Sequence, residues 1–318
     1  MRFVIIGAGA IGGVMGAQLH ERGATVVLVA RGDHYHAIRD RGLRVESPEG
    51  TRVVAVPAVD DVAAAELSAG DVAILAVKSQ HTTAVLDSLR TAAPPTISIV
   101  CAQNGVENER VALRSFANVY GLCVRLPASH LEPGHVRAHR APVAGILDLG
   151  RYPSGVDDTA EELAARLRES GFVSDPLPDI MRWKYTKLLL NLGNAIEAIV
   201  GPDARGGTLY ARARAEGMAC LQAAGIDFAS DTEDAARRAN LVPRPAGAPV
   251  GGSSWQSMTR RTGNVEVDFL NGEIVLLGRL HAVPTPVNEA LRRLANELAR
   301  SHAAPGTLTE DDVLRLVS

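Results

Sequence analysis

Lys187, Asn191 and Asn194 are polar residues in a segment, residues 180–200, that is otherwise apolar on most sides. Their spacing places them on one narrow face of the helix that this segment predicts. A helix that is apolar on most sides is buried, and a polar group buried without a partner costs about 1–3 kcal/mol. We therefore expect these side chains to face a polar cleft or a ligand. The alternative is that they form the solvent-facing side of an amphipathic helix.

A glycine-rich turn follows the first apolar segment of the chain. Residues 3–12 read Phe-Val-Ile-Ile-Gly-Ala-Gly-Ala-Ile-Gly, and a second predicted strand follows at Thr25–Ala30. In such a turn Gly7 permits the tight bend, Gly9 lets a pyrophosphate approach the backbone, and Gly12 lets the next helix pack on the strand. The context favours a dinucleotide site over an ordinary strand–helix turn. The predicted cofactor-binding residues of the turn are Gly7, Ala8, Gly9, Ala10, Ile11 and Gly12.

Arg31 indicates which dinucleotide binds. NAD sites usually place an acidic residue near the end of the second strand, where it binds the ribose 2′-hydroxyl. No acid stands at Val29, Ala30 or Arg31. A guanidinium would instead bind a 2′-phosphate through charge-assisted bonds. The sequence therefore favours NADP, with a solvated surface arginine as the alternative.

A nicotinamide cofactor suggests a role for Lys187. Hydride transfer to a carbonyl creates alkoxide charge on oxygen, and a nearby ammonium can stabilise that charge and donate the proton. Partial burial favours the neutral amine and eases the donation. Lys184, on the edge of the same face, is interpreted as a solvated neighbour.

Two further residues follow predicted strands of the sheet. Asn104 comes after the strand at 96–101, and Lys78 comes directly after the strand at 72–77. Ligands bind at this edge of an open α/β sheet. Asn104 could therefore contact the cofactor or substrate, and Lys78 a phosphate or carboxylate. A plain Asn-Gly turn and a surface lysine are the alternatives.

Glu266 and Ser254 are weaker candidates in the second half. Glu266 lies near the start of a predicted helix at 262–281, where an acid often only complements the helix dipole. Ser254 follows a glycine pair and could bind an anion, but a plain helix cap explains it equally well.

The order of elements predicts an α/β fold with an N-terminal Rossmann-type doubly wound sheet, followed by an all-helical C-terminal domain. The predicted strands are 2–6, 25–30, 52–56, 72–77, 96–101 and 117–121. Residues 122–155 are expected to be irregular strands and turns, before a helix at 157–170 and a short strand at 172–174.

Long helical stretches begin at Asp179. They are predicted at 180–200, 208–225, 230–240, 262–281, 286–302 and 309–317, with loops at 201–207 and 242–252. We expect an NADP-binding domain at 1–178 and a helical substrate domain at 179–318, with the substrate in a cleft between them.

Composition excludes several classes of function. A net charge of −3 gives no support for nucleic-acid binding. The sequence contains no stretch of 18 apolar residues, so we expect no membrane span. The first strand starts within two residues of Met1, so we expect no signal peptide. Three scattered cysteines, Cys101, Cys123 and Cys220, indicate reduced thiols in a cytoplasmic protein. Histidine spacing predicts no metal site.

Taken together and in order, these motifs resemble the ketopantoate reductases (2-dehydropantoate 2-reductases) over essentially the whole chain. The matching residues are Gly7, Gly9, Gly12, Arg31-Gly32, Lys78, Gln103-Asn104-Gly105-Val106, Trp183, Lys187, Asn191, Ser254, Glu266-Val267-Asp268, Asn271-Gly272 and Pro284-Thr285-Pro286.

The resemblance implies NADPH-dependent reduction of ketopantoate to pantoate, a step toward coenzyme A. It implies that Lys187 is the general acid and that Glu266 binds the substrate hydroxyl and positions the lysine. Asn104 would hold the nicotinamide side, and Lys78 would lie near cofactor and substrate. Asn191, Asn194 and Ser254 would orient the substrate, and Arg31 would bind the 2′-phosphate.

Departures from the family pattern touch the substrate side. Many family members place the second asparagine eight residues after the catalytic lysine, but Ala195 stands there and Asn194 comes one residue earlier. After Lys78, His81 occupies the usual glutamine position and Gln80 comes one residue before it. Trp255-Gln256-Ser257 follows Ser254 in place of the common run ending in Gln-Asp. A reductase of another branched or specialised 2-oxo acid therefore stays open, as does a non-catalytic NADP-binding sensor. The oligomeric state is left open as well, a homodimer being one state the sequence allows.

Overall fold

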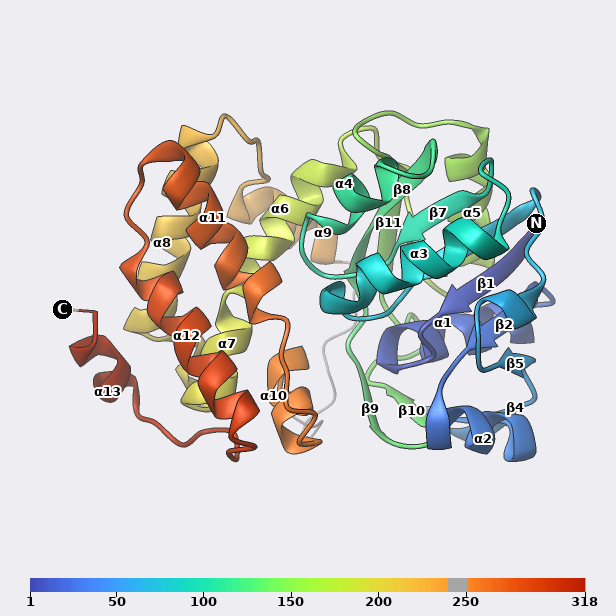
Figure 1. Cartoon of the computed structure of the whole chain (residues 1–318), viewed down its shortest axis with the longest axis horizontal. Helices are drawn as coiled ribbons and strands as arrows, with labels where there is room; N and C mark the ends of the chain where they lie inside the picture. The colour runs from blue at the N-terminus through green and yellow to red at the C-terminus, as the bar shows by residue number, and fades with distance from the viewer. Residues whose placement is uncertain (240–250, 318) are drawn as a thin grey trace. The chain divides into compact units, whose positions relative to one another are not determined.

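The computed structural model describes residues 1–239 and 251–317 (Figure 1). These residues form two compact units. The first comprises Met1–Lys184 and a segment that begins at Asp231, and the second comprises Tyr185–Ser230 and the described chain from residue 251 on. None of the helices in the described ranges is long and apolar enough to cross a membrane.

A seven-stranded sheet forms the centre of the first unit. Its strands, in spatial order, are β5 (Ala58–Val59), β2 (Thr25–Val29), β1 (Arg2–Ile6), β6 (Asp71–Leu75), β7 (Ser98–Cys101), β8 (Asn118–Arg125) and β11 (Ile146–Arg151). All neighbours pair in parallel except β11, which runs antiparallel to β8. The strand order reverses between β1 and β6, which is where doubly wound sheets bind ligands. The predicted fold class is confirmed.

Both faces of this sheet are covered because successive side chains of a strand point to opposite faces. In β1, Phe3 and Ile5 belong to one buried cluster, while Val4 and Ile6 belong to another. The first cluster includes residues of α1 and α5, and the second includes residues of α3 and α4. The helices of this unit are α1 (Ala10–Glu21), α2 (Gly32–Arg41), α3 (Thr82–Ala92), α4 (Asn108–Leu113), α5 (Asp158–Glu169) and α9 (Asp231–Arg238).

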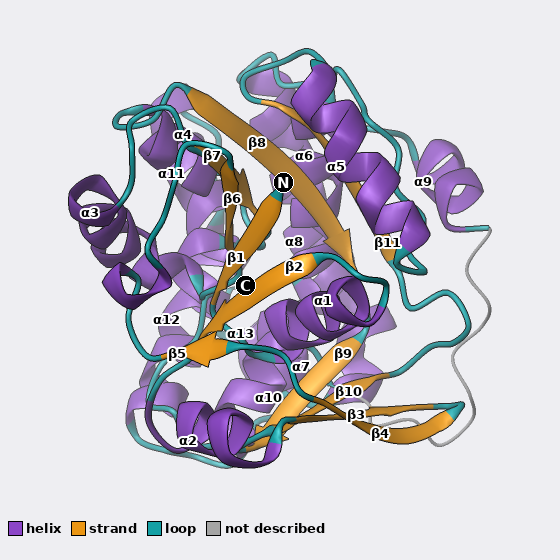
Figure 2. Ribbon diagram, turned by 90° about the vertical axis from the view of Figure 1, so that its right-hand side faces the viewer, coloured by secondary structure: helices purple, strands orange, loops and turns teal. Residues whose placement is uncertain are grey.

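A second, four-stranded sheet packs on the other side of α1, as Figure 2 shows. Its strands in order are β4 (Gly50–Val54), β3 (Leu43–Ser47), β10 (His135–Ala138) and β9 (Ala128–Glu132). Glycines let α1 fit between the two sheets: a Cβ at Gly16 would lie 2.6 Å from Leu28 of the large sheet, and one at Gly13 would lie 2.8 Å from Val136 of the small one.

The small sheet corrects two expectations. The strand predicted at 52–56 pairs antiparallel with β3 and is not part of the doubly wound sheet. Much of the 122–155 segment, expected to be irregular, forms regular strands. Gly134, with φ +73°, makes the turn of the β9–β10 hairpin. A turn signal within a hairpin looks like an irregular loop when its two strands are short.

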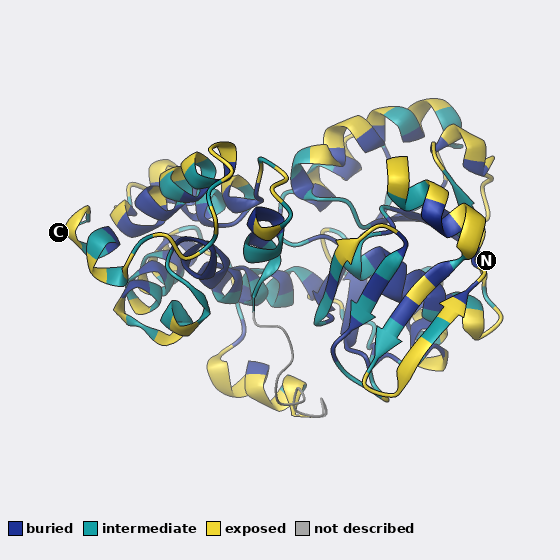
Figure 3. Ribbon diagram, turned by 90° about the horizontal axis from the view of Figure 1, so that it is seen from below, coloured by how far each residue is buried: buried dark blue, intermediate teal, exposed yellow. Residues whose placement is uncertain are grey.

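The second unit is helical, as predicted. It contains α6 (Ile180–Asn191) from Tyr185 on, and six further helices in the described ranges: α7 (Gly193–Ile199), α8 (Thr208–Ala223), α10 (Ser253–Thr259), α11 (Asn271–His281), α12 (Pro286–Arg300) and α13 (Glu310–Arg315). Helix α7 lies at the centre: every residue of it is buried, and it contacts α8, α10 and α12. Figure 3 shows the surrounding helices with buried residues on one side and exposed residues on the other.

The single helix expected at 180–200 is instead two helices, broken at Leu192. Arg205 donates to the carbonyl of Leu190 over 2.9 Å, and the Asn271 amide donates to the carbonyl of Leu192 over 3.4 Å. Side chains that take carbonyls out of the helical ladder are a recognised cause of kinks. The helix expected at 262–281 is shorter too, because α11 begins only at Asn271, after a 3₁₀ turn at Val267–Phe269.

Helix α9 packs within the first unit, although its residues were expected in a helical domain at 179–318. Asp234 pairs with Arg125 of β8 at 2.5 Å, and Arg237 pairs with Asp148 of β11. Charge pairing across about 90–110 residues of sequence explains the placement, and helical periodicity carries no signal for it. The loop expected at 242–252 lies outside the described residues, apart from its last two positions.

Candidate active site

The glycine turn between β1 and α1 has the geometry of a close backbone approach. Gly7 has φ +106°, and a Cβ there would lie 2.9 Å from backbone atoms of Ala76 and Val77. A Cβ at Gly12 would lie 2.1 Å from the carbonyl oxygen of Gly7. Both positions therefore accept only glycine unless the helix moves away from the strand.

The amino end of α1 has room and donors for an anion. Gly9 is its N-cap residue, and no side chain among the described residues caps the helix there. Of the residues that the structure describes, a Cβ added at Gly9 would come within 4 Å of one atom, Nδ1 of His130, at 3.8 Å. Uncapped N–H groups with open space above them fit a pyrophosphate.

His34 fixes this turn from the side of α2, a role that the sequence analysis did not predict. The N–H of Gly134 donates to His34 Nδ1 over 2.8 Å, and His34 Nε2 lies 2.7 Å from the carbonyl oxygen of Ala8. Because Nδ1 accepts, the ring proton is on Nε2 and is donated to Ala8. Arg31, three residues earlier, is exposed at the start of α2, directly after β2.

Lys78 and Asn104 follow β6 and β7, and a buried polar network joins their two loops. Ser79 Oγ donates to the carbonyl of Asn104 over 3.2 Å, and Asn108 Nδ2 donates to the same carbonyl over 3.0 Å. Thr82 Oγ1 donates to Asn108 Oδ1 over 2.7 Å. The backbone of Asn104 is thus held in one place at the ligand-binding edge of the sheet.

The chain contains only three lysines, Lys78, Lys184 and Lys187, among 33 basic residues. Arginine serves everywhere else. Lysine differs from arginine in being a compact ammonium that can lose its proton. Two of the three are predicted site residues, which makes the third, Lys184, worth the same attention.

Lys184 is not the solvated neighbour that its position on the helix suggested. It is 3% exposed and pairs with Glu109, which is fully buried. The same ammonium donates to the carbonyl of Gln103 over 3.2 Å and to that of Cys101 over 3.5 Å. Burial raises the pKa of the Glu109 carboxyl, an effect that the ammonium of Lys184 opposes.

The remaining candidates lie in the second unit. Lys187 is half-buried and Asn191 is 8% exposed, both before the helix break, whereas Asn194 follows it in α7 and is 5% exposed. Leu192, between the two helices, keeps helical backbone angles (φ −57°, ψ −29°), so the interruption there does not by itself move Asn194 away from Lys187 and Asn191. The face shared by these three residues stays a prediction.

Ser254 and Glu266 are both buried, at 2% and 7% exposure. Ser254 Oγ has no hydrogen-bond partner among the described residues, and Gly252, not a serine, is the N-cap of α10. The helix-cap alternative for Ser254 is therefore wrong. Glu266 precedes a three-residue 3₁₀ turn and lies five residues before α11, which leaves little helix dipole for it to complement.

Glu197 and Arg205 were missed by the sequence reasoning. Glu197 is 4% exposed, pairs with Arg205 and accepts the N–H of Gly252 over 2.5 Å. Arg205 also donates to Asn194 Oδ1 over 3.4 Å. This pair holds Asn194 and the residue that begins α10 in one cluster. The loop residue Arg205 lies in no periodic pattern, so nothing local signals its role.

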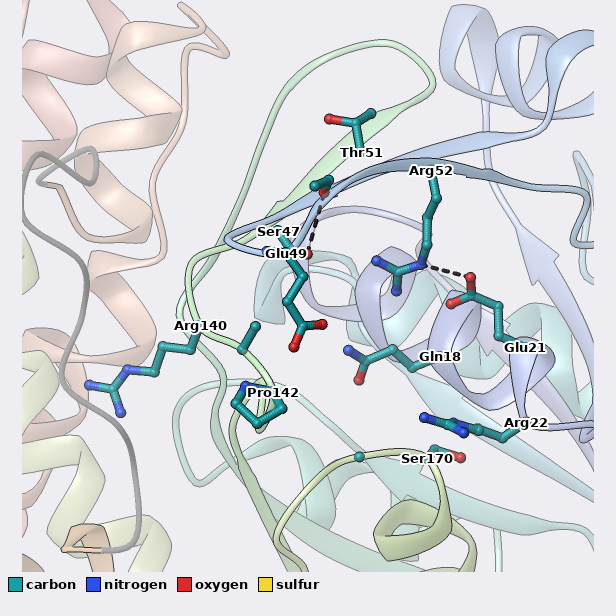
Figure 4. Close-up of a pocket in the computed structure, with 13 residues that line it drawn as sticks. Gln18, Glu21, Arg22, Ser47, Glu49, Thr51, Arg52, Arg140, Pro142 and Ser170 are labelled. Atoms are coloured by element: carbon teal, nitrogen blue, oxygen red, sulfur yellow. Dashed lines mark hydrogen bonds and ion pairs between the residues drawn. The ribbon is translucent and has the colours of Figure 1, made fainter.

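A separate pocket of about 380 Å³ lies on the first unit, between the end of α1, the β3–β4 hairpin and residues 140–142 (Figure 4). None of the described residues that line it is a candidate site residue. Its charged lining residues are three arginines and two glutamates, Arg22, Arg52, Arg140, Glu21 and Glu49. The mixture favours neither an anionic nor a cationic ligand. Arg52 is paired with Glu21 at 2.7 Å.

A doubly wound unit with an open glycine turn, joined to a helical unit that carries a lysine, buried amides and a carboxylate, defines a nicotinamide-dependent oxidoreductase. Comparisons with known proteins give the family. The protein-family model described as "Ketopantoate reductase PanE/ApbA" matches residues 3–154, and the family model for the "C terminal" part matches residues 179–299. The chain belongs to the ketopantoate reductase family.

Individual relatives agree over nearly their full lengths. The 2-dehydropantoate 2-reductase of Archaeoglobus fulgidus is 30% identical over 304 residues, covering 92% of this chain and 96% of the relative. That of Pyrococcus horikoshii is 28% identical over 298 residues, covering 91% and 94%.

Solved structures share the fold. A ketopantoate reductase from Ralstonia eutropha superposes with a TM-score of 0.80 at 28% identity, covering 95% of this chain and 99% of that one. A D-mandelate dehydrogenase in complex with NADH and anilino(oxo)acetate has the same TM-score and coverage at 22% identity, which shows a common fold alone.

Proposed function

We propose that the protein reduces a 2-oxo acid to a 2-hydroxy acid with NADPH, and that its substrate is 2-dehydropantoate (ketopantoate), which it converts to pantoate. The observation that carries this proposal is Lys187: a half-buried amine near buried amides, in a chain that uses arginine for all but three of its basic residues. Family membership supports the same reaction.

In this proposal NADPH, held by the glycine turn with Arg31, Lys78 and Asn104, supplies the hydride. Lys187 donates the proton that completes the new hydroxyl group. Glu266 binds the substrate hydroxyl and positions Lys187. The amides and hydroxyl of Asn191, Asn194 and Ser254 orient the oxo acid. Ser254 Oγ, which has no hydrogen-bond partner in the part of the chain that the structure describes, supports this role, because a buried hydroxyl without a partner is costly unless a ligand completes it.

The choice of cofactor can be tested at Arg31. Arg31→Ala should raise the Kd of NADPH by about 10- to 150-fold, since a hydrogen bond to a charged group contributes about 1.5–3 kcal/mol. The Kd of NADH should change little, because NADH has no 2′-phosphate. Fluorescence titration of both cofactors measures the two values. Arg41→Ala, at the other end of the same helix, is the control and should leave both unchanged. Equal weakening of NADPH and NADH would remove Arg31 from the phosphate site.

The reaction is tested by following NADPH oxidation with a panel of branched, linear and aromatic 2-oxo acids. We expect the highest kcat/KM with ketopantoate. The place of Asn194, one residue before the position usual in the family, favours a second candidate, a reductase of another branched 2-oxo acid, and a different substrate with the highest kcat/KM would establish it. Absence of turnover with every acid would identify an NADP-binding sensor instead.

The proposal also covers the location of the protein in the cell and its oligomeric state. We infer a cytoplasmic enzyme, which the three free, buried thiols support. We also infer a homodimer, as described for a ketopantoate reductase from Staphylococcus aureus that shares the fold at 20% identity. Sedimentation equilibrium of the full chain tests the dimer; a mass of one chain, 33.5 kDa, at micromolar concentration would contradict it.

A further inference from the structure

The loop that carries Asn104 is held from one side by a buried ion pair. This loop runs from the end of β7 to the start of α4, and Glu109 lies in the first turn of α4. Lys184, in the first residues of α6, reaches the carbonyls of Cys101 and Gln103 and the carboxylate of Glu109. An ammonium has three N–H donors, and here each has an acceptor. Lys184 therefore contacts residues on both sides of Asn104 in the sequence, Cys101 and Gln103 before it and Glu109 after it.

The other side of the loop is held by the neutral network of Ser79, Thr82 and Asn108. Ser79 and Asn108 both donate to the carbonyl of Asn104, at 3.2 and 3.0 Å. Gln103 Nε2 donates to Thr82 Oγ1 over 2.7 Å, so the side chain of Gln103 joins this network while its carbonyl binds Lys184. The loop therefore has a neutral anchor, the network, and a charged one, the Lys184–Glu109 pair.

The charged anchor is enclosed by the protein, with Lys184 3% exposed and Glu109 fully buried. Gly121 of β8 packs directly on the pair: a Cβ there would lie 3.4 Å from both Glu109 Oε1 and Lys184 Cδ, at ordinary van der Waals contact, and 3.3 Å from Ile180. Glu109 Oε2 is buried with no hydrogen-bond partner among the described residues. Burying two charges in this way is a poor means of gaining stability, because apolar residues of the same size often do as well or better. The pair is more readily explained by what it holds in place.

We propose that Lys184 and Glu109 are a positioning pair for catalysis: they hold the Asn104 loop against the first turn of α6, the helix on which Lys187 follows three residues later. Lys184 is not itself a catalytic residue, because it is enclosed by protein. The inference rests on the proposed function, since it assigns to Asn104 and Lys187 the roles given above.

The test separates positioning from stability with three variants. Lys184→Met and Glu109→Leu each leave one buried partner uncompensated and should lower both Tm and kcat. The double variant Lys184→Met/Glu109→Leu removes both charges and should recover most of the Tm. Its kcat should stay about 10- to 100-fold below that of the unaltered protein, because a misplacement of about 1 Å is enough to cost that much. The Kd of NADPH should rise by a smaller factor than kcat falls, because its phosphates bind at the glycine turn and Arg31 and only its nicotinamide side meets the Asn104 loop.

A matched control comes from the opposite edge of the same sheet. Arg2 pairs with the buried Asp71, 5% exposed, at the amino ends of β1 and β6. Asp71→Asn should lower Tm with little change in kcat, which shows that lost stability alone does not slow turnover. A double variant that recovers both Tm and wild-type kcat would overturn the proposal.

A second measurement does not depend on turnover. In the double variant, the amides of residues 102–108 should exchange with solvent at least about tenfold faster than in the unaltered protein, while those of β1 stay protected. Unchanged exchange in this loop would also overturn the proposal. If the unaltered protein reduces none of the oxo acids, the proposed function fails, and amide exchange still decides whether the pair holds the loop.

Discussion

Lys187→Ala should lower kcat for reduction of the 2-oxo acid by about 10²- to 10⁴-fold, the contribution usual for a positioned general acid. The alkoxide formed by hydride transfer would then have to take its proton from water. Binding of NADPH should be nearly unaffected, because Lys187 belongs to the second unit and the dinucleotide turn to the first. Steady-state kinetics together with fluorescence titration of NADPH measure both effects.

Two controls distinguish loss of the proton donor from loss of local structure. Lys187→Arg keeps the positive charge, but a guanidinium does not release a proton near neutral pH, so kcat should remain low. Small alkylamines added to Lys187→Ala should restore part of the turnover and should not help Lys187→Arg. Near-normal kcat in Lys187→Ala would exclude it as the acid, and the proton donor would have to be sought elsewhere.

Gly12→Ala should weaken NADPH binding at least about tenfold and destabilise the protein by about 1–3 kcal/mol, the range typical of overpacking. The new Cβ would lie 2.1 Å from the carbonyl oxygen of Gly7 and 2.9 Å from the side chain of Ile5. To relieve these contacts α1 must move away from β1, which displaces the N–H groups at its amino end. Alanine's higher helix propensity, about 1 kcal/mol, offsets only part of that cost.

Gly70→Ala is the matched control for this substitution. Gly70 precedes β6, and a Cβ there would meet no atom within 4 Å. Its stability in urea unfolding and its affinity for NADPH should stay close to those of the unaltered protein. If Gly12→Ala bound NADPH as tightly as Gly70→Ala does, the close packing of α1 would not be needed for the dinucleotide turn.

Local patterns in the sequence predicted most of the fold that positions the site. The apolar runs at β1, β6 and β7 predicted strands, and the alternation of strands with helices predicted the doubly wound sheet. The small sheet was missed because its strands are short and pair across long stretches of sequence, such as β3 with β10. The break at Leu192 was missed for a related reason, since Arg205 and Asn271 cause it from outside the helix.

In the candidate site, too, some residues could be predicted from local patterns and others depend on contacts with distant segments. The close packing at Gly7 and Gly12 could be predicted because it follows from backbone geometry at fixed positions in one strand–turn–helix unit, whereas the role of Arg31 stays a prediction from its charge and position. Lys184 could not be interpreted correctly, because a helical wheel shows which face a residue lies on and not what the face meets. Its partner Glu109 is 75 residues away in the chain.

The sequence by itself determined the fold class, the tight glycine turn and the family, because each depends on residue types at short, fixed spacing. Tertiary structure alone decided that Lys184 is a buried partner of Glu109, that Ser254 Oγ is buried with no hydrogen-bond partner among the described residues, and that Arg205 contacts Asn194. Each of these depends on desolvation and on contacts between distant segments. Burial by distant parts of the chain sets the energy of a charge or a hydroxyl, and no local pattern records it.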